Sequence, residues 1–217
     1  MDFAAIFDWD GVIIDSSAQH ERSWELLAEE INKPLPEGHF KRGFGKKNEV
    51  IIPDLGWAAD AAEVQAIGAR KEELYRELIR RDGVTPLPGA RELLEALDAA
   101  GIVCAVGSST ARINIETIFD MTGLRRFFRA VVTGEDVKHG KPAPDVFLAA
   151  AERIGAEPRH CVVFEDALVG IEAAHAGGMK CVAVATTNPI ELLDHAELAV
   201  ASLLDLDVGH LRGLMSA

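Results

Sequence analysis

The chain has 217 residues, of which 48% are hydrophobic and 26% charged, a balance typical of a globular protein with one or two domains. Its formal net charge of −13 argues against nucleic acid or an anionic membrane surface as a partner, because both select a basic face. No apolar run approaches the ~20 residues that cross a bilayer, so the sequence predicts no membrane span.

The first predicted strand, residues 3–7, runs directly into the segment Asp8-Trp9-Asp10-Gly11-Val12. Residues two apart on extended backbone point to the same side, so the carboxylates of Asp8 and Asp10 should face one spot. Two acids held this close repel each other unless a cation joins them or one carries a proton, and either arrangement is chemically useful. A plain turn at a strand end, where Asp and Gly are common, is the alternative interpretation.

Residues 15–85 predict an all-helical insert between this strand and the rest of the chain. The segments 20–32 and 61–81 have helical patterns, and 48–55 is short and apolar. Trp24 and Leu27 share one apolar stripe in the first segment. No strand pattern is evident there. The sequence therefore predicts a core domain made of residues 1–14 and 86–217, interrupted by a helical domain at 15–85.

The second part of the chain alternates strand and helix patterns. Continuous apolar runs, typical of parallel strands buried on both faces, occur at 102–107, 129–134, 160–164, 180–185 and 198–201. Helices are predicted between them at 90–100, 145–155 and 167–176, with Asp145 as the cap of the second. The predicted fold class is α/β: a doubly wound, mostly parallel, Rossmann-like sheet with an inserted α-helical domain.

The three cysteines, Cys104, Cys161 and Cys181, each lie in one of these apolar strands. An odd number of cysteines in core positions predicts free thiols in a reducing compartment rather than a disulfide or metal framework. The first strand begins at once, without a basic segment before it, so we expect no signal peptide and a cytoplasmic protein.

Polar residues follow the successive strands, at the edge where open α/β sheets bind ligands. Ser108, Ser109 and Thr110 follow the second strand, Lys141 follows the third, and Glu165-Asp166 follow the fourth. Taken singly, the hydroxyls and acids could cap helices and the lysine could be a surface residue. Their joint placement with Asp8 and Asp10 favours a functional site.

These motifs together resemble the haloacid dehalogenase-like superfamily, in its phosphatase and phosphomutase branch with a helical cap. The residues that carry the resemblance are Asp8-Trp9-Asp10-Gly11-Val12, Ser108, the run Lys141-Pro142-Ala143-Pro144-Asp145, and the run from Phe164 to Ile171. The helical insert lies where that branch places its cap. The second acid, Asp10, matters most, because dehalogenases of the superfamily lack it.

The resemblance implies a catalytic role for four residues. Asp8 would be the nucleophile that forms an aspartyl-phosphate, and Asp10 the general acid and base. Lys141 and Ser108 would stabilise the charge on the phosphoryl group. For its acid role Asp10 should rest protonated near neutral pH, and crowding by other acids favours this.

The resemblance also implies a Mg²⁺ cofactor, whose preference for hard oxygen ligands suits this edge of the sheet. The implied metal ligands are the Asp8 carboxylate, the backbone carbonyl of Asp10, Asp166, and Glu165 directly or through water.

The predicted substrate-binding residues are His20, Arg42, Lys46, Lys71 and Ser109. His20 and Lys71 are similar to cap residues of β-phosphoglucomutases, although His20 could instead pack near the cap hinge. Lys46 and Arg42 lie in the loop 41–48 and could be solvated charges. That loop lacks the Ser-Arg pair typical of the mutases, which argues against a mutase.

The leading prediction is a Mg²⁺-dependent phosphatase that hydrolyses a small phosphorylated metabolite, such as a sugar phosphate. The alternative is a phosphomutase of the β-phosphoglucomutase type. A more distant alternative is a non-enzymatic phosphoacceptor domain, although such receivers place the acceptor after a later strand and have no helical cap. The sequence leaves the oligomeric state open, and a monomer is favoured.

Overall fold

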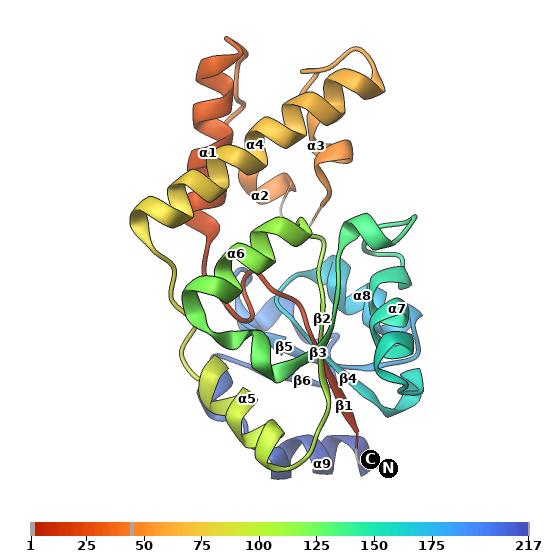
Figure 1. Ribbon diagram of the computed structural model, residues 1–217. Helices are drawn as coiled ribbons and strands as arrows, with labels where there is room; N and C mark the ends of the chain where they lie inside the picture. Colours follow the sequence, from red (N-terminus) through yellow and green to blue (C-terminus); the bar gives the residue numbers. More distant parts are fainter. Residues whose placement is uncertain (1–2, 44–45, 217) are drawn as a thin grey trace.

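The computed structural model describes residues 3–43 and 46–216 and contains a six-stranded, wholly parallel sheet (Figure 1). The strands are β1 (Ala4–Phe7), β2 (Cys104–Gly107), β3 (Phe128–Val132), β4 (Cys161–Glu165), β5 (Lys180–Val184) and β6 (Leu198–Val200). Their order is β3-β2-β1-β4-β5-β6, so the chain winds outward in both directions from β1. This confirms the predicted doubly wound fold and places the end of β1 at the topological switch point, where ligands bind in such sheets.

Helices cover both faces of the sheet, which explains why the strands are apolar without alternation. The first face packs against α5 (Ala90–Ala99), α6 (Arg112–Thr122) and α9 (Val208–Ser216), and the second against α7 (Asp145–Ile154) and α8 (Leu168–Ala176). On the first face the rings of Phe7 and Phe164 stack 4.4 Å apart. Neighbouring strands are thereby held in the register that brings their carboxyl ends to one edge.

The helical insert comprises α1 (Ser17–Glu30), α2 (His39–Gly43), α3 (Asn48–Asp54) and α4 (Ala61–Asp82), which stand over the carboxyl edge of the sheet (Figure 1). It has an apolar cluster of its own, built around Trp24, Trp57 and Leu74. At the far end of α4, Tyr75 and Ile79 pack into the cluster of the sheet instead. The separate cluster supports residues 15–85 as a distinct unit, a division that we retain as a proposal. Residues 44–45 of the predicted substrate loop lie outside the described residues.

The sequence did not identify every element. It missed α2, α6 and α9. Within residues 3–43 and 46–216 it also missed the short 3₁₀ helices η1 (Leu124–Phe127), η2 (Gly134–Asp136), η3 (Pro158–His160), η4 (Ile190–Leu192) and η5 (Leu203–Asp205). The predicted cap of α7 was wrong. Pro144 is the residue before that helix, and the Asp145 carboxylate instead accepts from the backbone N–H of His139, 3.3 Å away.

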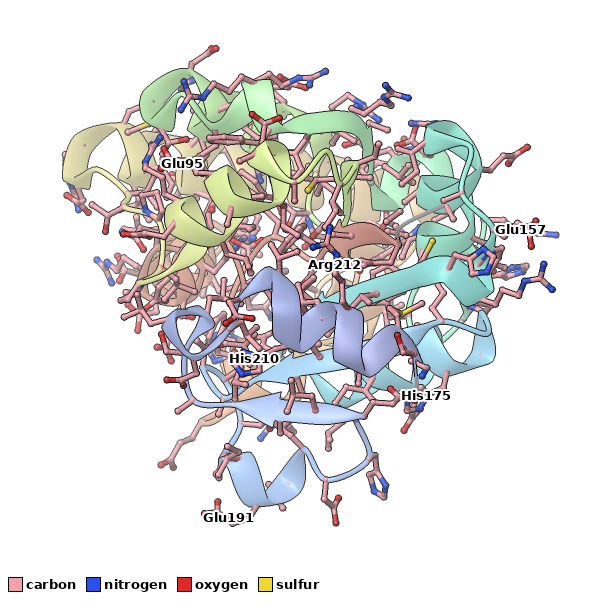
Figure 2. All side chains as sticks on the ribbon, turned by 90° about the horizontal axis from the view of Figure 1, so that it is seen from below. Glu95, Glu157, His175, Glu191, His210 and Arg212 are labelled. Carbon is pink, nitrogen blue, oxygen red and sulfur yellow. The ribbon has the colours of Figure 1, made fainter. Side chains whose placement is uncertain are left out.

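The end of the core opposite the insert offers no gathering of functional side chains among the residues described. In Figure 2, α9 lies across this end, and Glu95, Glu157 and Glu191 project from its periphery, well apart from one another. The three cysteines are buried free thiols inside the core, as predicted. Of the helices described, none combines the length and the apolar character that a membrane span requires.

Candidate active site

The residues that directly follow β1 alternate in direction, as the two-residue period of extended backbone predicts. Trp9 is fully buried and packs edge-on against Phe119, with ring centroids 4.9 Å apart. The backbone N–H of Asp8 donates to the carbonyl of Phe164 over 2.9 Å, which extends the sheet by one residue. Asp8 and Asp10 both line a single cavity between core and insert. The buried tryptophan therefore anchors the turn that presents both carboxylates.

Lys141 supplies the positive charge that pairs with the carboxylates of Asp8 and Glu165. Its Nζ lies 3.0 Å from Oδ1 of Asp8 and also donates to Glu165, and its side chain is almost fully buried. Burial raises the pKa of Asp8 to about 6 although the neighbouring ammonium opposes the shift. Burial alone would lower the pKa of Lys141, but the two carboxylates outweigh it and raise that pKa. Lys141 is therefore held as a cation beside the candidate nucleophile.

Glu165 has two roles at the end of β4. One of its oxygens pairs with Lys141, while the other accepts the backbone N–H groups of Asp166 and Ala167 at 2.7 and 2.8 Å. These two bonds fix the loop before α8 but do not cap the helix, whose N-cap residue is Ala167 and which has no side-chain cap, so the alternative interpretation of this acid as a cap is wrong. A Cβ on Gly170 would overlap the Glu165 carboxylate, so the first turn of α8 needs a glycine for this close approach.

Three carboxylates at this edge form an arrangement that fits a divalent cation. Asp8, Glu165 and Asp166 each offer an oxygen, and these atoms lie within 4.8 Å of one another. Oδ1 of Asp166 is buried without a hydrogen-bond partner, and burial together with the other two acids raises the pKa of Asp166 well above its usual value. A Cβ at Gly11, whose φ is +81°, would collide with this carboxylate. Oxygen-only ligands with uncompensated charge suit Mg²⁺.

The environment of Asp10 corrects one sequence-based expectation. Burial would raise the pKa of Asp10, but His20, with Nε2 3.5 Å from Oδ1, and hydrogen bonds from the hydroxyls of Ser16 and Thr110 lower it to about 2. The expected resting proton on Asp10 was therefore wrong. The cause is that His20 and the two hydroxyl donors outweigh the effect of burial on the Asp10 pKa.

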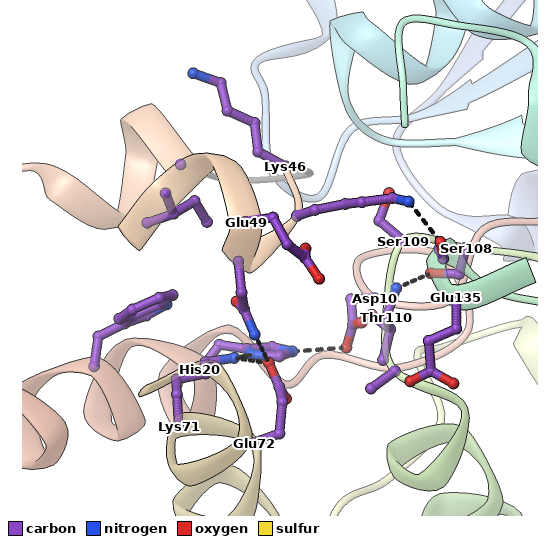
Figure 3. Close-up of a pocket in the computed structure, with 18 of the residues that line it drawn as sticks. Asp10, His20, Lys46, Glu49, Lys71, Glu72, Ser108, Ser109, Thr110 and Glu135 are labelled. Carbon is purple, nitrogen blue, oxygen red and sulfur yellow. Dashed lines mark hydrogen bonds and ion pairs between the residues drawn. The ribbon is translucent and has the colours of Figure 1, made fainter. Parts of the chain in front are cut away.

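His20 connects Asp10 to the insert. Its Nδ1 lies 2.7 Å from Nζ of Lys71 (Figure 3). Its ring stacks on Tyr75, with ring centroids 3.9 Å apart. An ammonium group can only donate, so Nδ1 of His20 accepts from Lys71, and Nε2 is the ring nitrogen that faces Asp10. His20 thus packs near the junction, which was the alternative interpretation made from the sequence, and it also orients the Asp10 carboxylate. Substrate contact by His20 remains a prediction.

The remaining predicted residues occupy different positions. Ser108 is buried at the end of β2, and Ser109 and Lys46 line the cavity, whereas Arg42 does not. The Arg42 guanidinium donates to the carbonyl of Glu37, 2.9 Å away. Figure 3 shows the Lys46 ammonium pointing away from Asp10. Substrate contact by Arg42, Lys46, Lys71 and Ser109 remains a prediction.

Two threonines that follow β5 belong to the site and were not identified from the sequence. The Thr187 hydroxyl donates to Oδ2 of Asp166, and the Thr186 hydroxyl donates to the carbonyl of Gly11. The rule that ligands gather beyond strand ends contained the necessary signal, because both residues directly follow the fifth predicted strand. These contacts fix the Asp166 carboxylate against the turn after β1.

With this geometry established, comparison with known proteins identifies the family. A model of the haloacid dehalogenase-like hydrolase family matches residues 4–178. The chain belongs to the haloacid dehalogenase-like hydrolase family. Membership of a hydrolase family argues against the non-enzymatic phosphoacceptor alternative and confirms that this is an enzyme.

Three relatives illustrate the range of the family. The chain is 39% identical to a chloroplastic 5-amino-6-(5-phospho-D-ribitylamino)uracil phosphatase of Arabidopsis thaliana, over 97% of this chain but only 57% of that protein. It is 37% identical to a β-phosphoglucomutase of Mycobacterium bovis, over 82% of this chain and 79% of that protein. Among solved structures, a family IA, variant 3 hydrolase from Entamoeba histolytica covers both chains completely with a TM-score of 0.90 and 27% identity.

In this haloacid dehalogenase-like enzyme a lysine also joins the insert to the core. Nζ of Lys47 donates to the carbonyls of Gly134 and Val137, the second over 3.2 Å. The stem of Lys47 runs so close to Gly134 and Gly140 that a Cβ on either would lie 3.0 and 3.3 Å from its Cε. These two glycines of the core therefore leave the space through which the Lys47 side chain reaches its two carbonyl acceptors.

We expect Lys47→Met to weaken the docking of the insert without unfolding either part. The methionine retains an apolar stem but loses both hydrogen bonds, so kcat/KM for a phosphate ester should fall about three- to tenfold. The exposed Lys33 supplies the matched control, because Lys33→Met removes the same charge from the insert away from the core. Steady-state kinetics with both variants would contradict this role if their kcat/KM values were equal.

We expect His20→Ala to lower kcat about tenfold or more, because Asp10 loses the imidazole that orients it, while Lys71 keeps Glu72 as a partner. The melting temperature should fall by only a few degrees, since the lost contact is one stacked ring. If His20 only packs the junction, thermal melting will shift while kcat stays at the wild-type value, and the orienting role will be refuted.

Proposed function

We propose that the protein is a Mg²⁺-dependent phosphatase that hydrolyses small phosphorylated metabolites through an aspartyl-phosphate on Asp8. The observation that carries this proposal is the position of the Asp8 carboxylate. It lies at the topological switch point, 3.0 Å from a buried ammonium and within a triad of acids that calls for a cation. The named phosphatase among the relatives supports the same reaction class.

The first chemical step follows from the charges around Asp8. A carboxylate oxygen attacks phosphorus, the bond to the ester oxygen breaks, and the phosphoryl group is transferred to Asp8. Lys141 offsets negative charge on the transferred group, and the buried Ser108 hydroxyl, at the end of the neighbouring strand, can donate to one of its oxygens. Both groups are fixed by burial, so they need little reorganisation during the reaction.

Asp8, Asp166 and Glu165 would hold the metal, with the backbone carbonyl of Asp10 as a further ligand. When bound, Mg²⁺ supplies positive charge that offsets the repulsion between a carboxylate nucleophile and an anionic phosphate.

Asp10 would handle the protons of both steps. As a resting carboxylate it can accept a proton from the water that hydrolyses the aspartyl-phosphate. To protonate the departing alcohol it must first gain a proton from solvent in the cavity, and the imidazole of His20, whose Nε2 lies 3.5 Å from Oδ1 of Asp10, would hold the carboxylate in place for both transfers. The insert would act as a cap, because it covers the cavity in which these steps occur and limits access of water.

A phosphomutase of the β-phosphoglucomutase type is the second candidate. The 37% identity to a named β-phosphoglucomutase favours it. The two functions differ in whether Asp10 activates water or a second substrate hydroxyl. Incubation with β-glucose 1-phosphate and a trace of glucose 1,6-bisphosphate distinguishes them: we expect inorganic phosphate or no reaction. Rapid accumulation of glucose 6-phosphate with little free phosphate would establish the mutase.

A screen of phosphorylated metabolites for released inorganic phosphate, with Mg²⁺ present, tests the leading proposal. We expect one group of small monoesters to be hydrolysed well above the background of an Asp8→Asn variant. No release from any ester or from p-nitrophenyl phosphate would overturn the proposal.

A further inference from the structure

We propose that the preferred substrate releases an uncharged polyhydroxylated alcohol, so that its single phosphate is its only anionic group. This inference rests on the proposed phosphatase function and deepens it. It arises from the charges in the part of the cavity away from Asp8, where the leaving group would lie.

The cavity has room for more than a phosphate. Its volume is about 400 Å³, and it extends from Asp8 and Lys141 in the core to His39, Lys46 and Glu49 in the insert. This is within the range of pockets that enclose small organic molecules. The groups contributed by the insert therefore face whatever is attached to the phosphate.

Most of the cations in this distal part are already engaged by the protein. Lys47 donates to two core carbonyls, and Lys71 to His20 and Glu72. Arg76 donates to Oδ1 of Asn114 over 3.0 Å. Among the cavity-lining residues that the structure describes, Lys46 is the cation without such a partner, and it points away from Asp10 (Figure 3). Within that described lining, no fixed cation is thus available for a second anionic group.

Several acceptors, in contrast, have no donor. Figure 3 shows Glu49 directed from α3 toward Asp10, with Glu135 on the opposite, core side, and neither carboxylate has a partner in the described parts of the chain. The third acceptor is His39. Its Nδ1 lies 3.2 Å from the carbonyl of Pro36 and must donate, so in the tautomer protonated on Nδ1 the buried Nε2, which has no partner, is an acceptor.

A hydroxylated leaving group complements this arrangement, because hydroxyl groups donate hydrogen bonds to carboxylates and imidazole nitrogens. A terminal carboxylate or a second phosphate would instead lie beside the like charges of Glu49 and Glu135 with no fixed counter-charge. The same residues therefore bind a neutral polyol and disfavour an anionic one.

A matched pair of substrates tests this inference. Sorbitol 6-phosphate and 6-phosphogluconate have the same carbon chain length and the same phosphate position, but the second ends in a carboxylate. We expect kcat/KM to be at least about tenfold higher for sorbitol 6-phosphate. Equal values, or a preference for 6-phosphogluconate, would overturn the inference. Such a result leaves the phosphatase function intact, whereas failure to hydrolyse either ester or p-nitrophenyl phosphate would refute the function itself.

A substitution at Glu49 tests whether this residue causes the preference for the substrate with the uncharged leaving group. Glu49→Gln removes the charge but keeps an acceptor, so the preference for sorbitol 6-phosphate should narrow about threefold or more, mainly through better use of 6-phosphogluconate. Glu172→Gln makes the same change at an exposed residue of α8 that does not line the cavity, and its ratio should equal that of the wild type. An unchanged ratio in Glu49→Gln would remove Glu49 from the proposal.

Discussion

Replacing Asp8 by asparagine should lower phosphate release at least about a thousandfold while the fold persists. The amide is nearly isosteric with the carboxylate, but it cannot form the phosphorylated intermediate. Lys141 keeps Glu165 as a partner, so the substitution leaves no buried charge unpaired. Phosphate release by the purified variant, with circular dichroism to verify the fold, provides the measurement.

The same substitution should stabilise the metal-free protein at neutral pH. Burial raises the pKa of Asp8 from 3.8 to about 6, so the folded state keeps this proton to higher pH than the unfolded chain. The free energy of unfolding therefore falls as the pH rises through this interval, and the uncharged amide of the Asp8→Asn variant removes that loss. Asp54→Asn, at an exposed residue of α3, is the matched control and should change neither turnover nor melting temperature. More than a few per cent residual activity in Asp8→Asn would show that another group is the nucleophile.

Removal of divalent cations should abolish turnover, and Mg²⁺ should restore it. The triad of Asp8, Glu165 and Asp166 carries more negative charge than Lys141 can offset, so an anionic phosphate would be repelled from the bare site. Asp166→Asn removes one ligand charge and should raise the Mg²⁺ concentration for half-maximal activity at least about tenfold. Titration of activity with Mg²⁺ after EDTA treatment and gel filtration measures both effects.

Thr187→Val tests the hydrogen bond that positions the Asp166 carboxylate, separately from the loss of that carboxylate as a metal ligand. The variant removes the hydroxyl that donates to Asp166 but keeps all carboxylates, so its Mg²⁺ requirement should rise less than that of Asp166→Asn. Undiminished turnover by protein shown to be free of metal would exclude a role for the cation.

The sheet and the convergence of Asp8, Ser108, Lys141 and Glu165 were predictable because they depend on local patterns. Continuous apolar runs define buried parallel strands, and parallel strands bring their carboxyl ends to one edge whatever the details of packing. Trp9 illustrates the same principle, since it lies between Asp8 and Asp10 just after β1 and is fully buried while both acids line the cavity.

The protonation state of Asp10 could not be predicted because it depends on donors that tertiary structure assembles. The Thr110 hydroxyl that accounts for part of the lowered pKa lies 100 residues away in the chain. Lys47 is a similar case, with its carbonyl acceptors 87 and 90 residues away. Such contacts depend on how the insert docks on the core, and no local pattern encodes that arrangement.

The most direct test of the central claim is to trap the phosphorylated enzyme. The protein is mixed with a substrate found in the metabolite screen, quenched in acid within one turnover, digested and sequenced by mass spectrometry. We predict the mass of one phosphoryl group on the peptide that contains Asp8, localised to that residue and absent from Asp8→Asn. Hydrolysis at the full rate with no phosphorylated peptide at any quench time, or with the group on another residue, would contradict the account.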